Sequence, residues 1–125
     1  VYNQSFESGI NDQLAVDFPE YSERINGITQ RMIDLLVPFR SRWLYHPDMK
    51  GSASLKSVLP AFVPGLSYDN LAIGDGGTAS LLYLSCITGN VSENERIQIF
   101  QNLKDYCYQD TLAEVKLLKV LYDNV

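Results

Sequence analysis

The sequence has 125 residues and a hydrophobic fraction of 46%, which fits one folded domain and excludes a wholly disordered chain. The net charge of −5 excludes a protein that coats nucleic acid over most of its surface, and the absence of a long apolar run excludes a membrane partner. Two isolated cysteines, Cys86 and Cys107, predict buried free thiols in a cytoplasmic protein and, with only one histidine, no zinc site.

The first elements predicted are a strand and a helix. Residues 1–3 are expected to end a strand. Residues 5–17 are predicted to be helical because Phe6, Ile10 and Leu14 recur at helical spacing. A carboxylate and an amide therefore stand where a strand passes into a helix.

A second short helix is predicted over residues 19–25, with Asn26-Gly27 as its end. The apolar run 31–37, bounded by Pro38, predicts a buried strand. Residues 38–53 are rich in proline, glycine, arginine and aromatic residues, and they are expected to form a loop.

The second half of the chain is predicted to be helical over residues 54–62, 78–88, 92–108 and 111–123. Residues 64–77 form an irregular stretch, and loops of such length in compact domains are usually functional or mobile. The whole inventory is an α/β chain that is mostly helical, with one to three strands.

A lone strand can neither satisfy its backbone hydrogen bonds nor bury both faces. The chain also begins without methionine. We therefore expect residues 1–125 to be a single domain fragment that lacks its N-terminal strands. Exposed strand edges at residues 1–3 or 32–36 would recruit a second copy, which predicts a homodimer.

Charge is unevenly distributed along the chain. Residues 24–56 carry a net charge of +4, and the remainder carries −9. The basic residues of this segment include Arg40, Arg42, Lys50 and Lys56, and aromatic residues lie between them. Such a segment could hold a nucleic-acid backbone beside an acidic metal site, or it could be a solvated basic loop.

Two groups of residues could carry chemistry. Asn3, Phe6 and Glu7 lie at the predicted strand-to-helix junction, whereas Tyr106 and Asp110 lie four residues apart on one helix face. Carboxylates from separate elements suit Mg²⁺ or Mn²⁺ in phosphodiester cleavage, and a tyrosine beside them could hydrogen-bond the attacking water.

Simpler structural roles remain open for the same residues. Asp110 and Thr111 could begin a new helix, with Thr111 and Glu114 at the spacing of a capping box. Glu7, in a first helical turn, could merely complement the helix dipole.

Asn3-x-x-Phe6-Glu7 resembles the second motif, NxxFD, of the DEDD 3′–5′ exonucleases, and Tyr106-x-x-x-Asp110 resembles the tyrosine form of their third motif. More specifically, much of the chain is similar to an uncharacterised bacterial domain family of the same fold, usually found behind a RecB-like nuclease domain. The stretches that carry this similarity are RMIDLLVPFR, MKGSASLKSVLPAFVPGLSYDNLAIGDGGTASLLYL and YCYQDTLAEVKLL.

The resemblance implies the C-terminal portion of a ribonuclease-H-like α/β fold. It implies that Asp110 and Glu7 ligate Mg²⁺ or Mn²⁺ and that Tyr106 orients the nucleophilic water. The substrate-binding residues would be Asn3, Phe6, Arg40, Arg42, Lys50 and Lys56. The chain departs from the pattern in two ways: Glu7 replaces the usual aspartate, and the first motif, a DxE on the first strand, is absent.

The expected function is therefore part of a metal-dependent 3′–5′ exonuclease that acts on DNA or RNA ends and is inactive as this segment alone. A RecB-like nuclease domain is the expected upstream partner in the parent chain. The alternative is a catalytically degenerate module of the same fold that binds nucleic acid or protein. A helical scaffold without a nucleic-acid role is a third possibility.

Overall fold

The computed structural model describes residues 1–124, and its regular elements are all helical. The α-helices are α1 (Gln4–Asp17), α2 (Ser22–Thr29), α3 (Leu36–Arg40), α4 (Leu55–Phe62), α5 (Gly76–Ile87) and α6 (Glu93–Asp123), and two short 3-10 helices are η1 (Pro19–Tyr21) and η2 (Pro47–Met49). Residues 1–124 contain no strand. The predicted α/β class is therefore wrong for this chain, and so is the ribonuclease-H-like sheet implied by resemblance.

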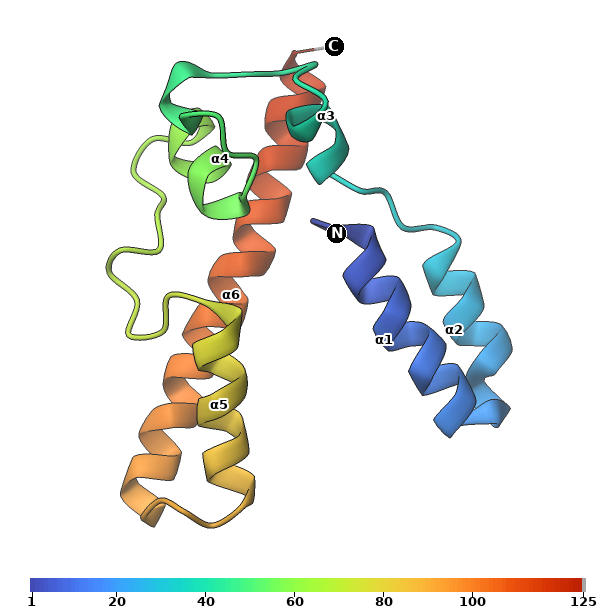
Figure 1. Cartoon of the computed structure of the whole chain (residues 1–125), viewed down its shortest axis with the longest axis vertical. Coiled ribbons are helices and arrows are strands. Elements are labelled where there is room, and N and C mark those ends of the chain that lie inside the picture. The colour runs from blue at the N-terminus through green and yellow to red at the C-terminus, as the bar shows by residue number, and fades with distance from the viewer. Residues whose placement is uncertain (125) are drawn as a thin grey trace.

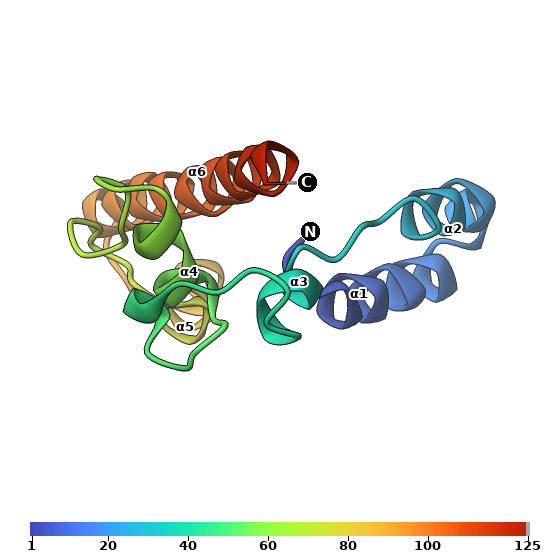
Figure 2. The same ribbon diagram turned by 90° about the horizontal axis from the view of Figure 1, so that it is seen from above.

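Two helical hairpins extend from a small core (Figure 1). In one hairpin α5 packs on the N-terminal half of α6, and in the other α1 packs on α2. Seen from above, the α1–α2 hairpin projects away from α6 (Figure 2). The core lies where α3, η2 and α4 meet the C-terminal half of α6, and its buried residues are Phe39, Met49, Val58, Leu59, Tyr68, Ala113 and Leu117.

Asp34 explains why the apolar run 31–37 is not a strand. Its Oδ1 accepts hydrogen bonds from the backbone N–H of Leu36 at 2.9 Å and of Asn3 at 2.9 Å. A carboxylate that binds the N–H group two residues ahead closes a turn, and here that turn leads directly into α3. The run therefore bends into a short helix that buries Phe39.

The predicted strand at residues 1–3 is reduced to one local pairing. The Leu35 N–H donates to the Val1 carbonyl oxygen at 2.9 Å, and the Val1 nitrogen lies 3.2 Å from the Ile33 carbonyl oxygen. These two bonds align the start of the chain with residues 33–35 but do not extend into a ladder, because α1 starts directly after Asn3 and a turn starts at Asp34. They fix the entry of α1.

The predicted break between residues 108 and 111 is also wrong, because α6 runs without interruption. Its N-terminus has the predicted capping box, in which the Ser92 N–H donates to Glu95 Oε2 at 2.9 Å. Thr111 does not cap a helix: its hydroxyl donates to the Cys107 carbonyl oxygen at 3.0 Å, inside the helix.

The helices predicted over residues 5–17, 54–62 and 78–88 are present within two residues of their expected starts, but α2 continues to Thr29, beyond its predicted end. Cys86 is buried as expected, whereas Cys107 is exposed, which corrects that prediction. Although α6 is long, no helix within residues 1–124 combines the length and the apolar character needed to cross a bilayer.

Candidate active site

One pocket of about 350 Å³ brings together acidic and aromatic residues from both ends of the chain. The N-terminal side supplies Tyr2 and Glu7, and α6 supplies Tyr106, Asp110 and Glu114. The start of α4 and the irregular segment before α5 complete the lining with Ser54, Leu55, Lys56 and Tyr68. We refer to it as the carboxylate pocket.

Asp110 lies in the middle of α6 and is held by a tyrosine that the sequence did not single out. The Tyr68 hydroxyl donates to Asp110 Oδ1 at 2.6 Å, and Tyr68 is only 7% exposed. Burial and the neighbouring Asp110 carboxylate raise the pKa of Tyr68 well above its usual value, so the phenol stays protonated and remains a donor. Because α6 is continuous here, helix capping no longer accounts for Asp110.

Tyr106 lies one helical turn before Asp110, and its ring is 6.2 Å from that of Tyr68. Its hydroxyl reaches the first turn of α5, where a Cβ added at Gly76 would lie 3.8 Å from it. Burial, followed by the Asp110 carboxylate, raises the pKa of Tyr106, so its phenol is also protonated near neutral pH. The pocket thus has two neutral hydroxyl groups beside one carboxylate.

Glu7 enters the carboxylate pocket from the first turn of α1, where it also complements the helix dipole. Its Oε2 is buried and has no hydrogen-bond partner among the described residues. A buried carboxylate oxygen without a donor is costly unless a proton, a water or a cation satisfies it. Glu7 is therefore the least satisfied polar group of the pocket.

Tyr2 fixes the start of α1, and with it Glu7, against the rest of the molecule. Its hydroxyl donates to the Ala53 carbonyl oxygen at 2.6 Å, and its ring stacks on Phe39 with a centroid distance of 6.4 Å. Burial, followed by the charge of Asp34, raises the pKa of Tyr2. The segment that leads into the helix carrying Glu7 is therefore anchored by a partly buried aromatic side chain.

Glu114 and Lys56 add opposite charges to the pocket. Glu114 lies one turn beyond Asp110 and is 3.7 Å from the Val1 nitrogen. Lys56, at the start of α4, has no carboxylate within ion-pair distance among the described residues. The lysine lies near enough to Asp75 to contribute to the lowered pKa of that carboxyl, after the two hydrogen bonds from Thr78.

The ligand set fits a hard divalent cation only in part. The available donors are carboxylate oxygens, which Mg²⁺ and Mn²⁺ prefer, and the unpartnered Glu7 Oε2 is one of them. However, residues 1–124 contain no group of three or more His, Cys, Asp or Glu side chains arranged to hold a metal ion. The pocket thus offers part of a metal site.

The other residues implied in substrate binding do not all lie in the carboxylate pocket. Asn3 is the N-cap residue of α1, and its side chain accepts a hydrogen bond from Ser5 Oγ at 2.8 Å. Phe6 is 66% exposed and lies outside the carboxylate pocket. Lys56 lines the carboxylate pocket. Arg40 and Arg42 line a separate smaller pocket, and Lys50 lines neither of them.

Tyr68 and Glu114 belong to the site although sequence reasoning did not assign them. Glu114 could have been found, because residues 106, 110 and 114 share a helical face once the helix is continuous. The only signal for Tyr68 was its place in a long irregular segment.

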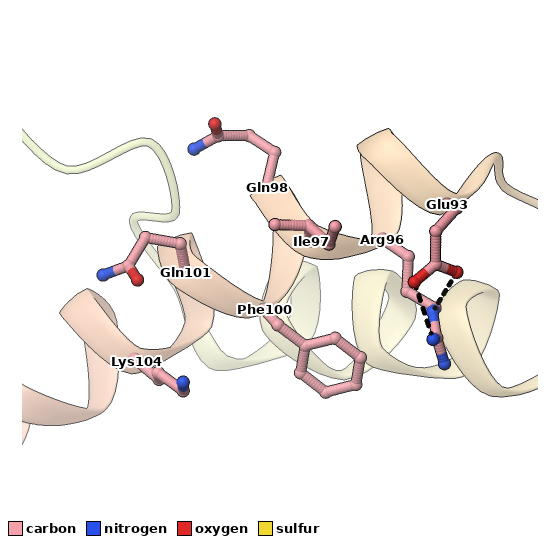
Figure 3. A pocket seen from close by; sticks show the side chains of 7 residues that line it. All are labelled: Glu93, Arg96, Ile97, Gln98, Phe100, Gln101 and Lys104. Carbon is pink, nitrogen blue, oxygen red and sulfur yellow. Dashed lines mark hydrogen bonds and ion pairs between the residues drawn. The ribbon is translucent and has the colours of Figure 1, made fainter.

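A larger hollow of about 470 Å³ lies along the N-terminal half of α6 (Figure 3). All of its lining residues come from this one helix, so it is a surface trough between side chains. Its Arg96 is engaged by Glu93 through two hydrogen bonds, at 2.9 and 3.0 Å. This hollow is lined by side chains of one helix, whereas the carboxylate pocket is lined by side chains of several elements.

Sequence comparison gives relatives without an assigned biochemistry. The family model "Domain of unknown function (DUF2779)" matches residues 1–54. "Uncharacterized protein MG366" of Mycoplasma genitalium is 28% identical over 98% of this chain and 20% of its own length. "Uncharacterized protein MG366 homolog" of Mycoplasma pneumoniae is 29% identical over 94% of this chain and 19% of its own length.

The chain thus spans about a fifth of the length of the curated relatives it matches. No solved structure matches. The expected similarity to a bacterial domain of unknown function is confirmed, but these relatives give no evidence of membership in the exonuclease superfamily.

Proposed function

We propose that this chain supplies part of the active site of a metal-dependent nuclease that hydrolyses phosphodiester bonds at DNA or RNA ends. The observation that carries the proposal is the convergence of Glu7 and Asp110 in one pocket, with a buried Glu7 oxygen that lacks a donor. Metal ligands account for both carboxylates, whereas a helix cap or dipole accounts for neither the position of Asp110 nor the burial of Glu7 Oε2.

In this proposal Glu7 and Asp110 hold Mg²⁺ or Mn²⁺, and ligands outside residues 1–124 complete the site. When bound, such an ion would stabilise the charge that develops on the phosphate oxygens. Tyr68 positions Asp110 through its 2.6 Å hydrogen bond. The protonated phenol of Tyr106 donates a hydrogen bond that orients the attacking water, and Lys56 binds a nonbridging oxygen of the substrate phosphate.

The test measures hydrolysis of end-labelled single-stranded DNA and RNA by the full-length protein with Mn²⁺ or Mg²⁺. Asp110→Asn and Glu7→Gln should each lower the rate at least about 100-fold, because a metal supplies several kcal/mol of stabilisation. Asp105→Asn on α6 and Asp12→Asn on α1 are matched controls that should leave the rate unchanged, because neither residue lines the carboxylate pocket.

Calorimetric titration with Mn²⁺ in the absence of nucleic acid gives a readout besides activity. The unsubstituted protein should bind Mn²⁺ and the two pocket variants should bind it more weakly. Equal binding and equal rates in all four variants would contradict the assignment.

A second candidate function is a non-catalytic module that binds nucleic acid or protein. The observation that favours it is the incomplete ligand set within residues 1–124. It predicts that the full-length protein binds oligonucleotides without hydrolysing them in either metal, and that Asp110→Asn leaves this binding intact.

A further inference from the structure

A second pocket of about 240 Å³ lies between the end of α3 and the loop before α4. Its floor is formed by Phe39 and Met49, which are 1% and 2% exposed and belong to the core. Its rim includes Arg40, Arg42 and Tyr45. We refer to it as the arginine pocket.

The two guanidinium groups of the arginine pocket have no carboxylate within ion-pair distance among the described residues. Partial burial opposes ionisation of Asp34, backbone hydrogen bonds outweigh it and lower the pKa of that carboxyl, and Arg40 contributes last to the lowering. Arg40 and Arg42 thus differ from Arg96, which forms an ion pair with Glu93. A pair of free guanidinium groups at a polar rim suits a phosphate, which accepts bidentate hydrogen bonds.

The two pockets are joined by one fixed loop. Residues 51–53 line the arginine pocket, and residues 54–56 line the carboxylate pocket. The Tyr2 hydroxyl holds this loop at the Ala53 carbonyl oxygen, at 2.6 Å. Three residues of chain span at most about 11 Å, so the linings of the two pockets adjoin along this loop.

We infer that Arg40 and Arg42 bind a backbone phosphate of a single-stranded nucleic acid whose end lies in the carboxylate pocket. This inference rests on the proposed function. Tyr45, at 46% exposure, lies on the same rim and offers a face on which a base can stack. The arginine pocket contacts the strand away from the scissile bond, so it contributes to substrate binding and not to the chemical step.

Fluorescence anisotropy of a labelled single-stranded DNA with the full-length protein in EDTA tests this inference without hydrolysis. Arg40→Gln and Arg42→Asn should each weaken binding about tenfold, as expected for loss of a charged hydrogen bond. Asparagine is chosen at position 42 because Arg42 has a left-handed backbone, with φ 58°, which asparagine tolerates. Each lost phosphate contact should also make the salt dependence shallower by about 0.7 in log–log slope.

Arg24→Gln is the matched control, since Arg24 is an exposed arginine of the same basic segment on α2, outside both pockets. It should bind as the unsubstituted protein does. Arg40→Lys, which keeps the charge without the planar fork, should bind with an intermediate affinity. If the pocket variants and the control weaken binding equally, or none weakens it, the inference is wrong.

Two further outcomes separate this inference from the proposed function. If binding depends on the arginines but Mn²⁺ does not bind at Glu7 and Asp110, the arginine pocket stands and the nuclease proposal fails. If inorganic phosphate protects the protein from thermal unfolding through Arg40 and Arg42 but the oligonucleotide does not bind, the pocket takes a free anion and the nucleic-acid inference is overturned.

Discussion

The Tyr68 hydroxyl decides how Asp110 is presented in the carboxylate pocket. It is nearly buried and donates a short hydrogen bond to a carboxylate on α6, 42 residues further along the chain. The amide of Gln109, next to Asp110, donates to the Ser67 carbonyl oxygen at 3.2 Å, so the segment before Tyr68 is also tied to α6. Tyr68 is therefore a positioning residue for the proposed metal ligand.

Tyr68→Phe should lower the free energy of unfolding by about 1 kcal/mol, because Asp110 loses a donor while the ring still fills the core. It should also weaken Mn²⁺ binding about tenfold, as expected when the partner of a ligand is removed. Thermal unfolding and calorimetric titration measure the two effects. Tyr83→Phe, on α5 and outside the carboxylate pocket, is the control; a loss of stability without a loss of Mn²⁺ affinity would refute the positioning role.

Three tyrosines make the fold sensitive to alkali. Burial raises the pKa of Tyr2, Tyr68 and Tyr106 above the usual value of about 10. The unfolded chain therefore releases these protons first, so stability should be constant below about pH 10 and fall as the pH rises further. The melting temperature measured from about pH 8 to 11 should show this fall, and Tyr68→Phe should make it less steep.

At the scale of elements, α6 determines which side chains of the site share a face. Its 31 residues carry the α5 hairpin at one end and the core contacts Ala113 and Leu117 at the other. Residues 106, 110 and 114 follow one another along one face at intervals of a turn. A break at residue 110 would have separated the phenol from the carboxylates.

The turn at Asp34 is the other local feature that shapes the site, because it joins the start of α1 to α3. Asp34→Ala should lower the free energy of unfolding by about 1 kcal/mol, as for loss of a helix cap, and Asp34→Asn should cost less because an amide oxygen still accepts. Asp69→Ala, in the exposed loop, should change stability by less than about 0.5 kcal/mol. Urea denaturation distinguishes these variants.

The stabilisation that Asp34 gives to this turn should be lost at low pH. Partial burial opposes ionisation of Asp34, but the N–H donors of Leu36, Asn3 and Gln4 outweigh it, so its pKa is lowered. The stabilisation is then present above the usual pKa of about 4 and is lost as the pH falls through the lower value of the folded state. Asp34→Asn should be less sensitive to acid over this range, and an unchanged acid profile would contradict the role assigned to the carboxylate.

The sequence predicted the helices and the cap that depend on residues close together along the chain. Apolar periodicity located α1, α4 and α5, and the Ser92–Glu95 capping box located the start of α6. The strand prediction failed because a short apolar run fits a strand or a buried helix equally well, and a distant contact between Asp34 and Asn3 decided between them. Motif resemblance found Glu7 and Asp110, whereas Tyr68 reaches Asp110 through a loop whose path no local pattern specifies.

The molecule exposes more surface than a compact monomer of the same mass. Its accessible surface is 8498 Å², whereas a compact monomer of 14.1 kDa exposes about 6,700 Å². An apolar groove of about 660 Å³ lies between α5 and α6, and its lining residues include Tyr83, Leu84 and Phe100. The excess of about 1,800 Å² is more than the roughly 800 Å² that each partner buries in a standard interface.

We therefore retain the prediction of a homodimer, formed through helical faces and not through the strand edges expected from sequence. Sedimentation equilibrium of the 125-residue chain should give twice the mass of 14.1 kDa at micromolar concentrations. Leu84→Lys should shift it to monomer, and Val16→Lys on α1 should not, because Val16 is 73% exposed, against 51% for Leu84, and lies outside this groove. A monomer throughout would refute the prediction.

Glu7 and Asp110 belong to parts of the molecule that share little direct packing. Asp110 lies on the long helix α6, whereas Glu7 lies on the α1–α2 hairpin. The main contact of this hairpin with the rest of the molecule is at the start of α1. An ion bound by both carboxylates would link the α1–α2 hairpin to α6 and bring the two closer together. The radius of gyration from small-angle scattering should then shrink when Mn²⁺ is added and stay constant in Glu7→Gln.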